Sequence, residues 1–134
     1  MNIISCAEPN WKDKDSFALV SRALVDIDFR HADTLWIPGN DDSVVALFVN
    51  ERKFVICQYR EERDSLPIGF TFSSYYSDGV ALTDNYHYAS GIYAVAEMPS
   101  LYVKHLSDRV KRRPDTAVVS VSVEELVKKW ESNL

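Results

Sequence analysis

Hydrophobic residues recur every three or four positions early in the chain, which is the spacing of an amphipathic helix. A helix is therefore predicted over 15–27, with Asp15 as its cap. Its apolar face consists of Phe17, Val20, Leu24 and Ile27. We expect this helix to end near Asp28, although the alternation of apolar and charged residues from Val25 to Arg30 also fits a short strand.

Two more helices are predicted in the last third of the chain. The first begins at Pro99, because proline is favoured at the first helical position. It ends at Arg113, because Pro114 pushes the residue before it out of the helical region. The final helix covers 123–132, behind the capping-box pair Ser122 and Glu125.

Between these helices, apolar residues run together or alternate with polar ones, which indicates strands. The clearest signal is a hairpin over 44–59, with its turn at Asn50-Glu51. A half-exposed strand is predicted over 68–73, and further strands over 92–97 and 117–123. Glycine, proline and charged residues predict loops at 36–42, 61–67 and 77–79.

The predicted order of elements is α-β-β-β-β-α-β-α. A chain of this length is a typical single domain, so we expect one domain over 1–134. Each helix has one apolar face to bury, and a sheet with helices on one side buries these faces economically. The fold class is therefore α+β, with a mostly antiparallel sheet of about five strands and helices packed on one face.

Charge and composition then narrow the classes of partner. The net charge is −5, with an acidic surplus in 1–100 and a small basic surplus in 101–134. An acidic body argues against nucleic-acid binding and favours a partner with a basic surface. No apolar run approaches the ~18 residues of a membrane span, and the first residues lack a secretory signal. We expect a cytoplasmic protein, with Cys6 and Cys57 as free thiols.

Sequence motifs for cofactors and metals are missing. The chain has no glycine-rich phosphate loop, no C-x-x-C pair and no H-E-x-x-H, so we expect no cofactor. Asp26, Asp28 and His31 have a spacing that could suit a metal. On a helix, however, Asp26 would point about 200° away from Asp28. We interpret the three residues as capping and turn residues, and we expect no metal.

Other candidate chemistry also has structural explanations. Cys57 could pair with His87 or His105, but a thiol in the middle of a strand is usually a packing residue. No catalytic residue is therefore assigned. A basic group closes the second predicted helix, where cations interact favourably with the helix dipole. It comprises Lys104, Arg109, Lys111, Arg112 and Arg113.

The segment 73–91 is the most distinctive, because tyrosines and polar residues replace the usual aliphatic ones. Tyrosine supplies large, stiff contact area and is enriched at binding surfaces. The partner-binding residues predicted here are Tyr75, Tyr76, Asp78, Asp84, Tyr86, His87 and Tyr88. The alternative is a long hairpin whose tyrosines alternate between core and surface.

These observations predict a small acidic protein-binding module that neutralises or escorts a partner protein. Bacterial immunity proteins, antitoxin-like inhibitors and secretion chaperones are similar to it in composition, but no motif is shared. Two alternatives stay open. One is a small enzyme that uses His87 with nearby aspartates and tyrosines for general acid–base chemistry. The other is a subunit of a homo- or hetero-oligomeric assembly, with the tyrosine segment as its interface.

Overall fold

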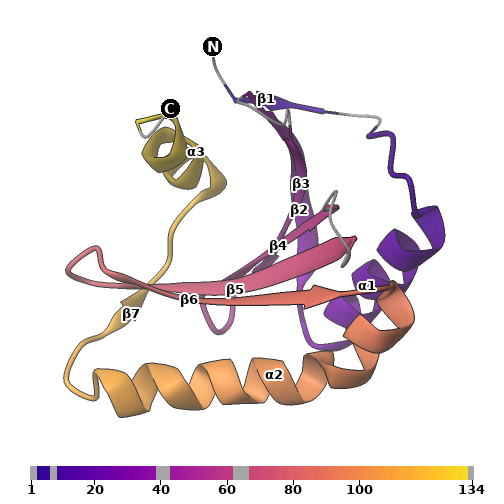
Figure 1. The fold of residues 1–134 in the computed structure, drawn as a ribbon. Helices are drawn as coiled ribbons and strands as arrows, with labels where there is room; N and C mark the ends of the chain where they lie inside the picture. The colour runs from indigo at the N-terminus through magenta and orange to yellow at the C-terminus, as the bar shows by residue number, and fades with distance from the viewer. Residues whose placement is uncertain (1–2, 7–8, 39–42, 62–66, 133–134) are drawn as a thin grey trace.

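A curled antiparallel sheet forms the centre of the computed structural model, which describes residues 3–6, 9–38, 43–61 and 67–132 (Figure 1). The strands are β1 (Ile4–Ser5), β2 (Arg30–Ile37), β3 (Ser43–Asn50), β4 (Val55–Glu61), β5 (Ile68–Tyr76), β6 (Ala81–Tyr88) and β7 (Val118–Val119). The helices are α1 (Lys14–Asp26), α2 (Gly91–Arg112) and α3 (Val123–Glu131). In the described residues the strand order is β1-β2-β3-β4-β5-β6, and β7 pairs with β5.

The first face of the sheet is covered by α1 and α2 (Figure 1). Val20 and Leu24 of α1 lie in one apolar core with Met98 of α2. That core includes Phe48 and Phe72 from the sheet, both essentially without solvent exposure. Burying side chains of this size is the main favourable contribution to folding.

The second face of the sheet is partly covered by α3. Leu126 of α3 is buried in a separate apolar cluster with Leu35, Leu47 and Ile56. Consecutive residues of a strand point to opposite faces, so the continuous apolar run of β3 contributes to both cores.

The two helices on the first face approach each other at Gly91. Its N–H donates to Ser16 Oγ at 2.8 Å, and a Cβ at Gly91 would lie 2.7 Å from the Ser16 Cα. Ser16 is itself held by Asp13, which caps α1 and accepts from the Ser16 N–H at 2.9 Å. The close approach requires glycine, because any other side chain would collide with the α1 backbone.

Several predictions are confirmed. The fold is α+β with an antiparallel sheet, and the hairpin predicted over 44–59 is formed by β3 and β4. The capping box of the last helix is present, since Ser122 Oγ accepts from the Glu125 N–H at 3.1 Å. The second long helix ends at Arg112, directly before the predicted stop at Arg113-Pro114.

The structure between α1 and β3 differs from the prediction. The helix stops at Asp26 and is capped by Asp13 rather than by Asp15. Asp28 then takes a left-handed conformation with φ of 71°, and residues 30–37, expected to be mostly loop, form β2. Pairing with β3 over the whole strand stabilises this conformation, which local sequence preferences alone do not reveal. Of the loop predicted at 36–42, residues 39–42 lie outside the described residues.

The strand predicted over 92–97 is wrong, because α2 already begins at Gly91. Ala94, Met98, Tyr102 and His105 are buried along one side of this helix, and that helical spacing overrides the short alternation of apolar residues. Pro99 therefore lies inside the helix rather than at its start.

The remaining corrections concern the sheet. It has seven strands in the described residues rather than five, because β1 and β2 were not predicted. The strand predicted over 117–123 is reduced to the two residues of β7. The helices pack on both faces rather than one, since α3 has its own core. The strand predicted to be half-exposed, β5, is almost entirely buried on both sides.

Candidate functional site

A hairpin formed by β5 and β6 carries the predicted partner-binding residues. Tyr76 N–H donates to Val80 O at 2.8 Å, and Gly79 N–H donates to Tyr76 O at 2.9 Å. The turn at 77–79 uses a left-handed Gly79 with φ of +88°, as three-residue hairpin loops require. The register then continues without a shift along the whole pair, so alternate residues of β6 face opposite sides of the sheet.

One side of β6 faces α2 and carries Asp84, Tyr86 and Tyr88. The Tyr88 hydroxyl donates to Glu97 of α2, and the ring of Tyr86 packs on Phe70 with centroids 5.3 Å apart. Burial raises the pKa of Tyr86, and the carboxylates of Asp84 and Asp108 raise it further. We call these residues the β6–α2 flank: Asp84, Tyr86, Tyr88, Glu97 and Asp108. Three carboxylates therefore surround two half-buried tyrosines.

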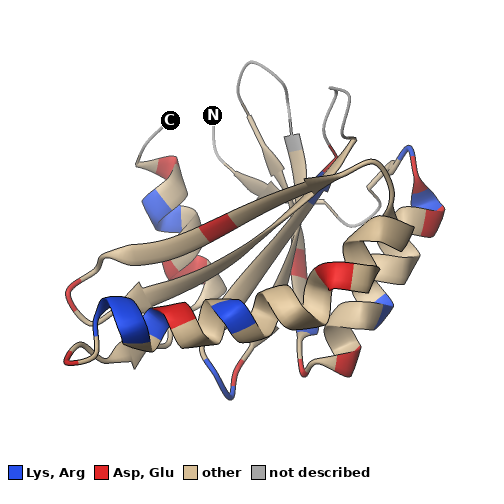
Figure 2. Cartoon of the chain, turned by 60° about the horizontal axis from the view of Figure 1, so that its bottom comes forward, with Lys and Arg blue, Asp and Glu red and all other residues tan. Residues whose placement is uncertain are grey.

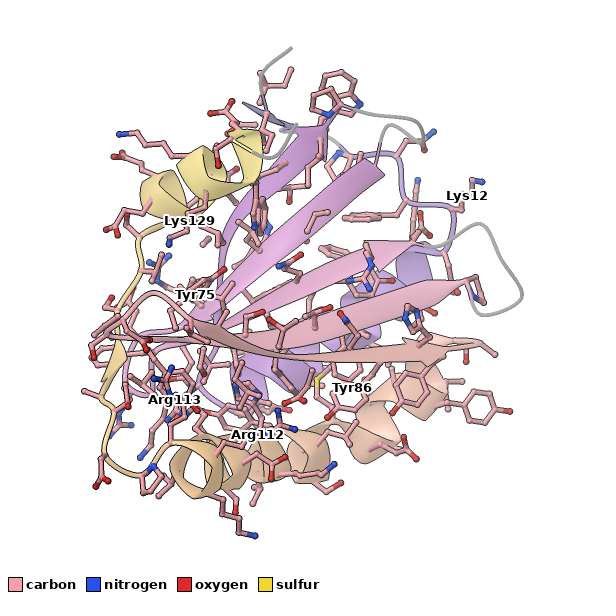
Figure 3. The ribbon with its side chains drawn as sticks, turned by 60° about the vertical axis from the view of Figure 1, so that its left-hand side comes forward. Lys12, Tyr75, Tyr86, Arg112, Arg113 and Lys129 are labelled. Atoms are coloured by element: carbon pink, nitrogen blue, oxygen red, sulfur yellow. The ribbon has the colours of Figure 1, made fainter. Side chains whose placement is uncertain are left out.

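The other predicted residues lie elsewhere. Tyr75 and His87 project from the opposite face, and Figure 3 shows Tyr75 beside Lys129 and away from Tyr86. Tyr76 is buried, and its hydroxyl donates to Arg109 O at 2.8 Å. Asp78 lies in the turn and pairs with both terminal nitrogens of Arg113. The structure thus brings Asp84, Tyr86 and Tyr88 together and separates them from the rest of the set.

A buried polar chain lies behind the flank and joins β5, β6 and α2. Ser74 Oγ lies 2.8 Å from His105 Nε2, and His105 Nδ1 lies 2.7 Å from Asp84 Oδ2. Arg109 Nη1 donates to Ser74 Oγ at 3.2 Å. Every group is satisfied if Ser74 donates to Nε2 and the Nδ1 proton of His105 is donated to Asp84. Burial lowers the pKa of His105, against the opposing effect of Asp84.

These residues are of the types found in serine hydrolases, but their burial gives them a structural role. Ser74 and His105 have no solvent exposure, so a substrate cannot reach the hydroxyl. Both ring nitrogens of His105 are already occupied, which also leaves no nitrogen for the Cys57–His105 pair considered from the sequence. Cys57 is buried, and burial raises the pKa of its thiol.

The candidate metal ligands do not gather. His31 Nε2 is 2.8 Å from Thr34 Oγ1, and Asp28 lies 3.8 Å from Arg52 in a surface ion pair. Asp26 ends α1. In the described part of the chain, no group of three His, Cys, Asp or Glu side chains could hold a metal ion.

The basic group at the end of α2 is divided by its contacts. Arg109 donates to Lys53 O as well as to Ser74, and Arg113 lies over the Tyr76 ring, 4.9 Å from its centroid. Lys104, Lys111 and Arg112 are exposed. Figure 2 shows the basic residues of α2 gathered towards its C-terminal end, where the helix dipole favours them.

The face of the sheet opposite α2 is polar where α3 does not cover it. Three neighbouring strands contribute Gln58, Arg60, Thr71, Ser73, Thr83, Asn85 and His87 to this area. Arg60 donates to Thr71 Oγ1 at 2.8 Å, and Thr71 bonds in turn to Asn85. A cavity of about 400 Å³ lies beside it, lined mainly by Phe54, Tyr75 and the segment 119–123. Its volume is at the lower end of the range for small-ligand sites.

The outer edge of β6 is open, since no strand in the described residues pairs with it. The bond from Tyr76 to Val80 fixes the alternation of the ladder. Ala81, Thr83 and Asn85 therefore direct their backbone N–H and C=O groups away from β5. The strand contains no proline and no bulge, and Figure 2 shows it along the near edge of the sheet.

The opposite edge of the sheet is protected. There β1 is only two residues long, and the neighbouring β2 has a register shift between His31 and Asp33. Short edge strands and bulges are the usual means by which proteins prevent edge-to-edge pairing. The edge of β6 has neither device.

Sequence reasoning missed Ser74, Glu97 and Asp108 as parts of this region. The spacing of Ala94 and His105 on a helical pattern could have revealed the buried side of α2, and hence the flank beside it. Across the described residues, no helix is long and apolar enough to cross a membrane. Comparison with protein families, with curated proteins and with solved structures finds no match for this chain.

Proposed function

We propose that the chain is a protein-binding module that neutralises or escorts its partner by pairing with an extended segment of it. The observation that carries this proposal is the open, regular edge of β6. Backbone groups of Ala81, Thr83 and Asn85 point outwards at the spacing of a strand. Such an edge binds an extended peptide through main-chain hydrogen bonds, and neighbouring side chains then select its sequence.

The β6–α2 flank favours a basic segment. A strand added to β6 would place every second side chain beside α2, next to Asp84, Glu97 and Asp108. Carboxylates around half-buried tyrosines complement lysine and arginine and discriminate against acidic segments. The tyrosines supply apolar contact area for the aliphatic parts of these side chains. The net charge of −5 acts in the same direction during encounter.

The small size and acidic character of the chain support a neutralising or escorting role, because a strand-capturing module occupies its partner without changing it. The acid–base alternative receives less support from the geometry. His87 projects from the face of β6 opposite to Asp84, and Asp78 is already bonded to Arg113.

Substituting Thr83 tests the proposal. Thr83→Pro removes an outward N–H that β5 does not use, and proline is tolerated on edge strands. Thr83→Ala removes the same hydroxyl but keeps the N–H, so it is the matched control. Both variants and the unmodified chain would be used to capture proteins from the native host, and their folding would be checked by circular dichroism.

We expect one stoichiometric partner that the unmodified chain and Thr83→Ala retain and Thr83→Pro loses. Equal capture by Thr83→Pro would show that the β6 edge is not the binding site. No stoichiometric partner in any sample would contradict the binding function itself.

A further inference from the structure

A second apolar face runs along α2 on its solvent side. It consists of Ile92, Ala96, Pro99, Val103, Leu106 and Val110, spaced alternately by four and three residues. Ile92 is 67% exposed, and Val103 and Val110 are each 64% exposed. Only Leu106 packs partly against the core. We call these six residues the α2 stripe.

The α2 stripe is separate from the surfaces already described. With about 100° of rotation per residue, it lies roughly 110° around the helix from Ala94, Met98 and Tyr102, which face the sheet. Glu97 and Asp108 of the β6–α2 flank lie on the other side again. In Figures 1 and 2 no other described element lies over the outer side of α2. The stripe therefore has no covering segment among the described residues.

Its spacing is that of a coiled-coil seam. Apolar residues that alternate by three and four positions keep one line facing a partner helix. From Ile92 to Val110 the stripe is about 27 Å long at 1.5 Å per residue. This length offers about five turns of contact to another helix.

The stripe is also symmetric about Leu101, which indicates its occupant. If two copies of α2 pack antiparallel around this point, Ile92 meets Val110 and Ala96 meets Leu106. Pro99 then meets Val103. Pairing a small residue with a large one fills the layer between helices, as Ala96 and Leu106 would. A two-fold interface needs this self-complementarity, whereas a different partner does not.

The residues beside the seam allow this pairing. Tyr93, Ser100 and Ser107 flank the stripe on its outer side and carry no charge. In the antiparallel arrangement they meet each other, so no like charges are brought together. Lys104 and Lys111 lie farther round the helix and remain in solvent.

We propose that two copies of this chain associate through antiparallel packing of the α2 stripe. This inference is independent of the proposed partner binding, because the β6 edge and the flank stay accessible on another side of α2. A dimer would present two such edges.

Sedimentation velocity across a dilution series tests the association. We expect the unmodified chain to form a dimer that dissociates on dilution, and Val103→Glu to be monomeric throughout. Val25→Glu is the matched control, since Val25 is 59% exposed on α1 and outside the stripe. A monomer at every concentration, or a dimer that Val103→Glu leaves intact, would overturn the proposal. Circular dichroism shows whether each variant is folded.

Cysteine cross-linking tests the antiparallel direction in a Cys6→Ser background, with Cys57 buried. A mixture of Ile92→Cys and Val110→Cys chains should form disulfide-linked heterodimers on mild oxidation. Ile92→Cys alone should not, because its two copies lie at opposite ends of the stripe. Efficient cross-linking of Ile92→Cys alone would contradict the antiparallel arrangement.

Discussion

Asp84 and His105 are joined by a hydrogen bond of 2.7 Å from the Nδ1 side of the imidazole to a carboxylate oxygen. This bond ties the edge strand β6 to α2, and Ser74 continues it into β5. Asp84 therefore contributes to the fold as well as to the β6–α2 flank. Its substitution cannot separate a loss of binding from a loss of stability, which is why Thr83 is the better site for a binding test.

We expect Asp84→Ala to lower the free energy of unfolding by about 1–3 kcal/mol, because a buried imidazole N–H loses its acceptor. Urea denaturation followed by tryptophan fluorescence measures this difference. Asp78→Ala is the control, since its ion pair with Arg113 is exposed and should contribute much less. Equal effects of the two substitutions would contradict a structural role for the Asp84–His105 bond.

The same bond predicts a pH dependence. Burial lowers the pKa of His105, so below the ordinary histidine pKa of about 6.5 the unfolded chain binds more protons than the folded chain. The free energy of unfolding should therefore fall on acidification below about pH 6.5, by at most about 1.4 kcal/mol per pH unit. Above that pH this group should leave it unchanged.

Urea denaturation between about pH 5 and pH 7 measures this dependence. His105→Gln should reduce the loss on the acid side, whereas the exposed His87→Gln should keep it. An identical pH dependence in His105→Gln would show that another group is responsible.

The contact between α1 and α2 predicts the effect of a single methyl group. Gly91→Ala places a Cβ 2.7 Å from the Ser16 Cα and 2.9 Å from the Ser16 carbonyl oxygen. Both atoms belong to the backbone, so one helix must shift, and we expect a loss of about 1–3 kcal/mol. Thermal denaturation measures it. An unchanged midpoint would mean that the two helices are not packed this closely.

The acidity of the β6–α2 flank predicts the salt dependence of partner binding. Asp108→Asn should weaken binding about two- to fivefold at low ionic strength, and the difference should shrink as salt is added. Asp115→Asn is the control, because Asp115 is exposed and lies beyond the end of α2. Titration calorimetry with the captured partner gives both constants. Tighter binding by Asp108→Asn would contradict a basic partner segment.

Strong local patterns were sufficient to predict some elements. The β3–β4 hairpin combines two apolar runs with a turn, and Ser122 with Glu125 marks the start of α3. The strand β2 was missed, because its pairing with β3 involves residues distant in sequence. The N-terminal part of α2 was misread because Tyr93 and Val95 favour strands, although burial of Ala94 and Met98 decides the outcome.

The candidate surface was predicted only in part. The tyrosine-rich composition of 73–91 correctly indicated an unusual segment, and Asp84, Tyr86 and Tyr88 do lie together. Composition could not show that Tyr75 and His87 belong to the other face, because this depends on the register of β5 and β6. It also could not reveal the open edge, which is a property of strand order in three dimensions.

Amide hydrogen exchange of the chain with and without its captured partner tests the central claim most directly. The outward amides of Thr83 and Asn85 should exchange quickly in the free chain and become protected in the complex. The amides of Asp84 and Tyr86, already paired with β5, should change much less. Protection confined to other surfaces, with Thr83 and Asn85 still exchanging quickly, would contradict strand pairing at β6.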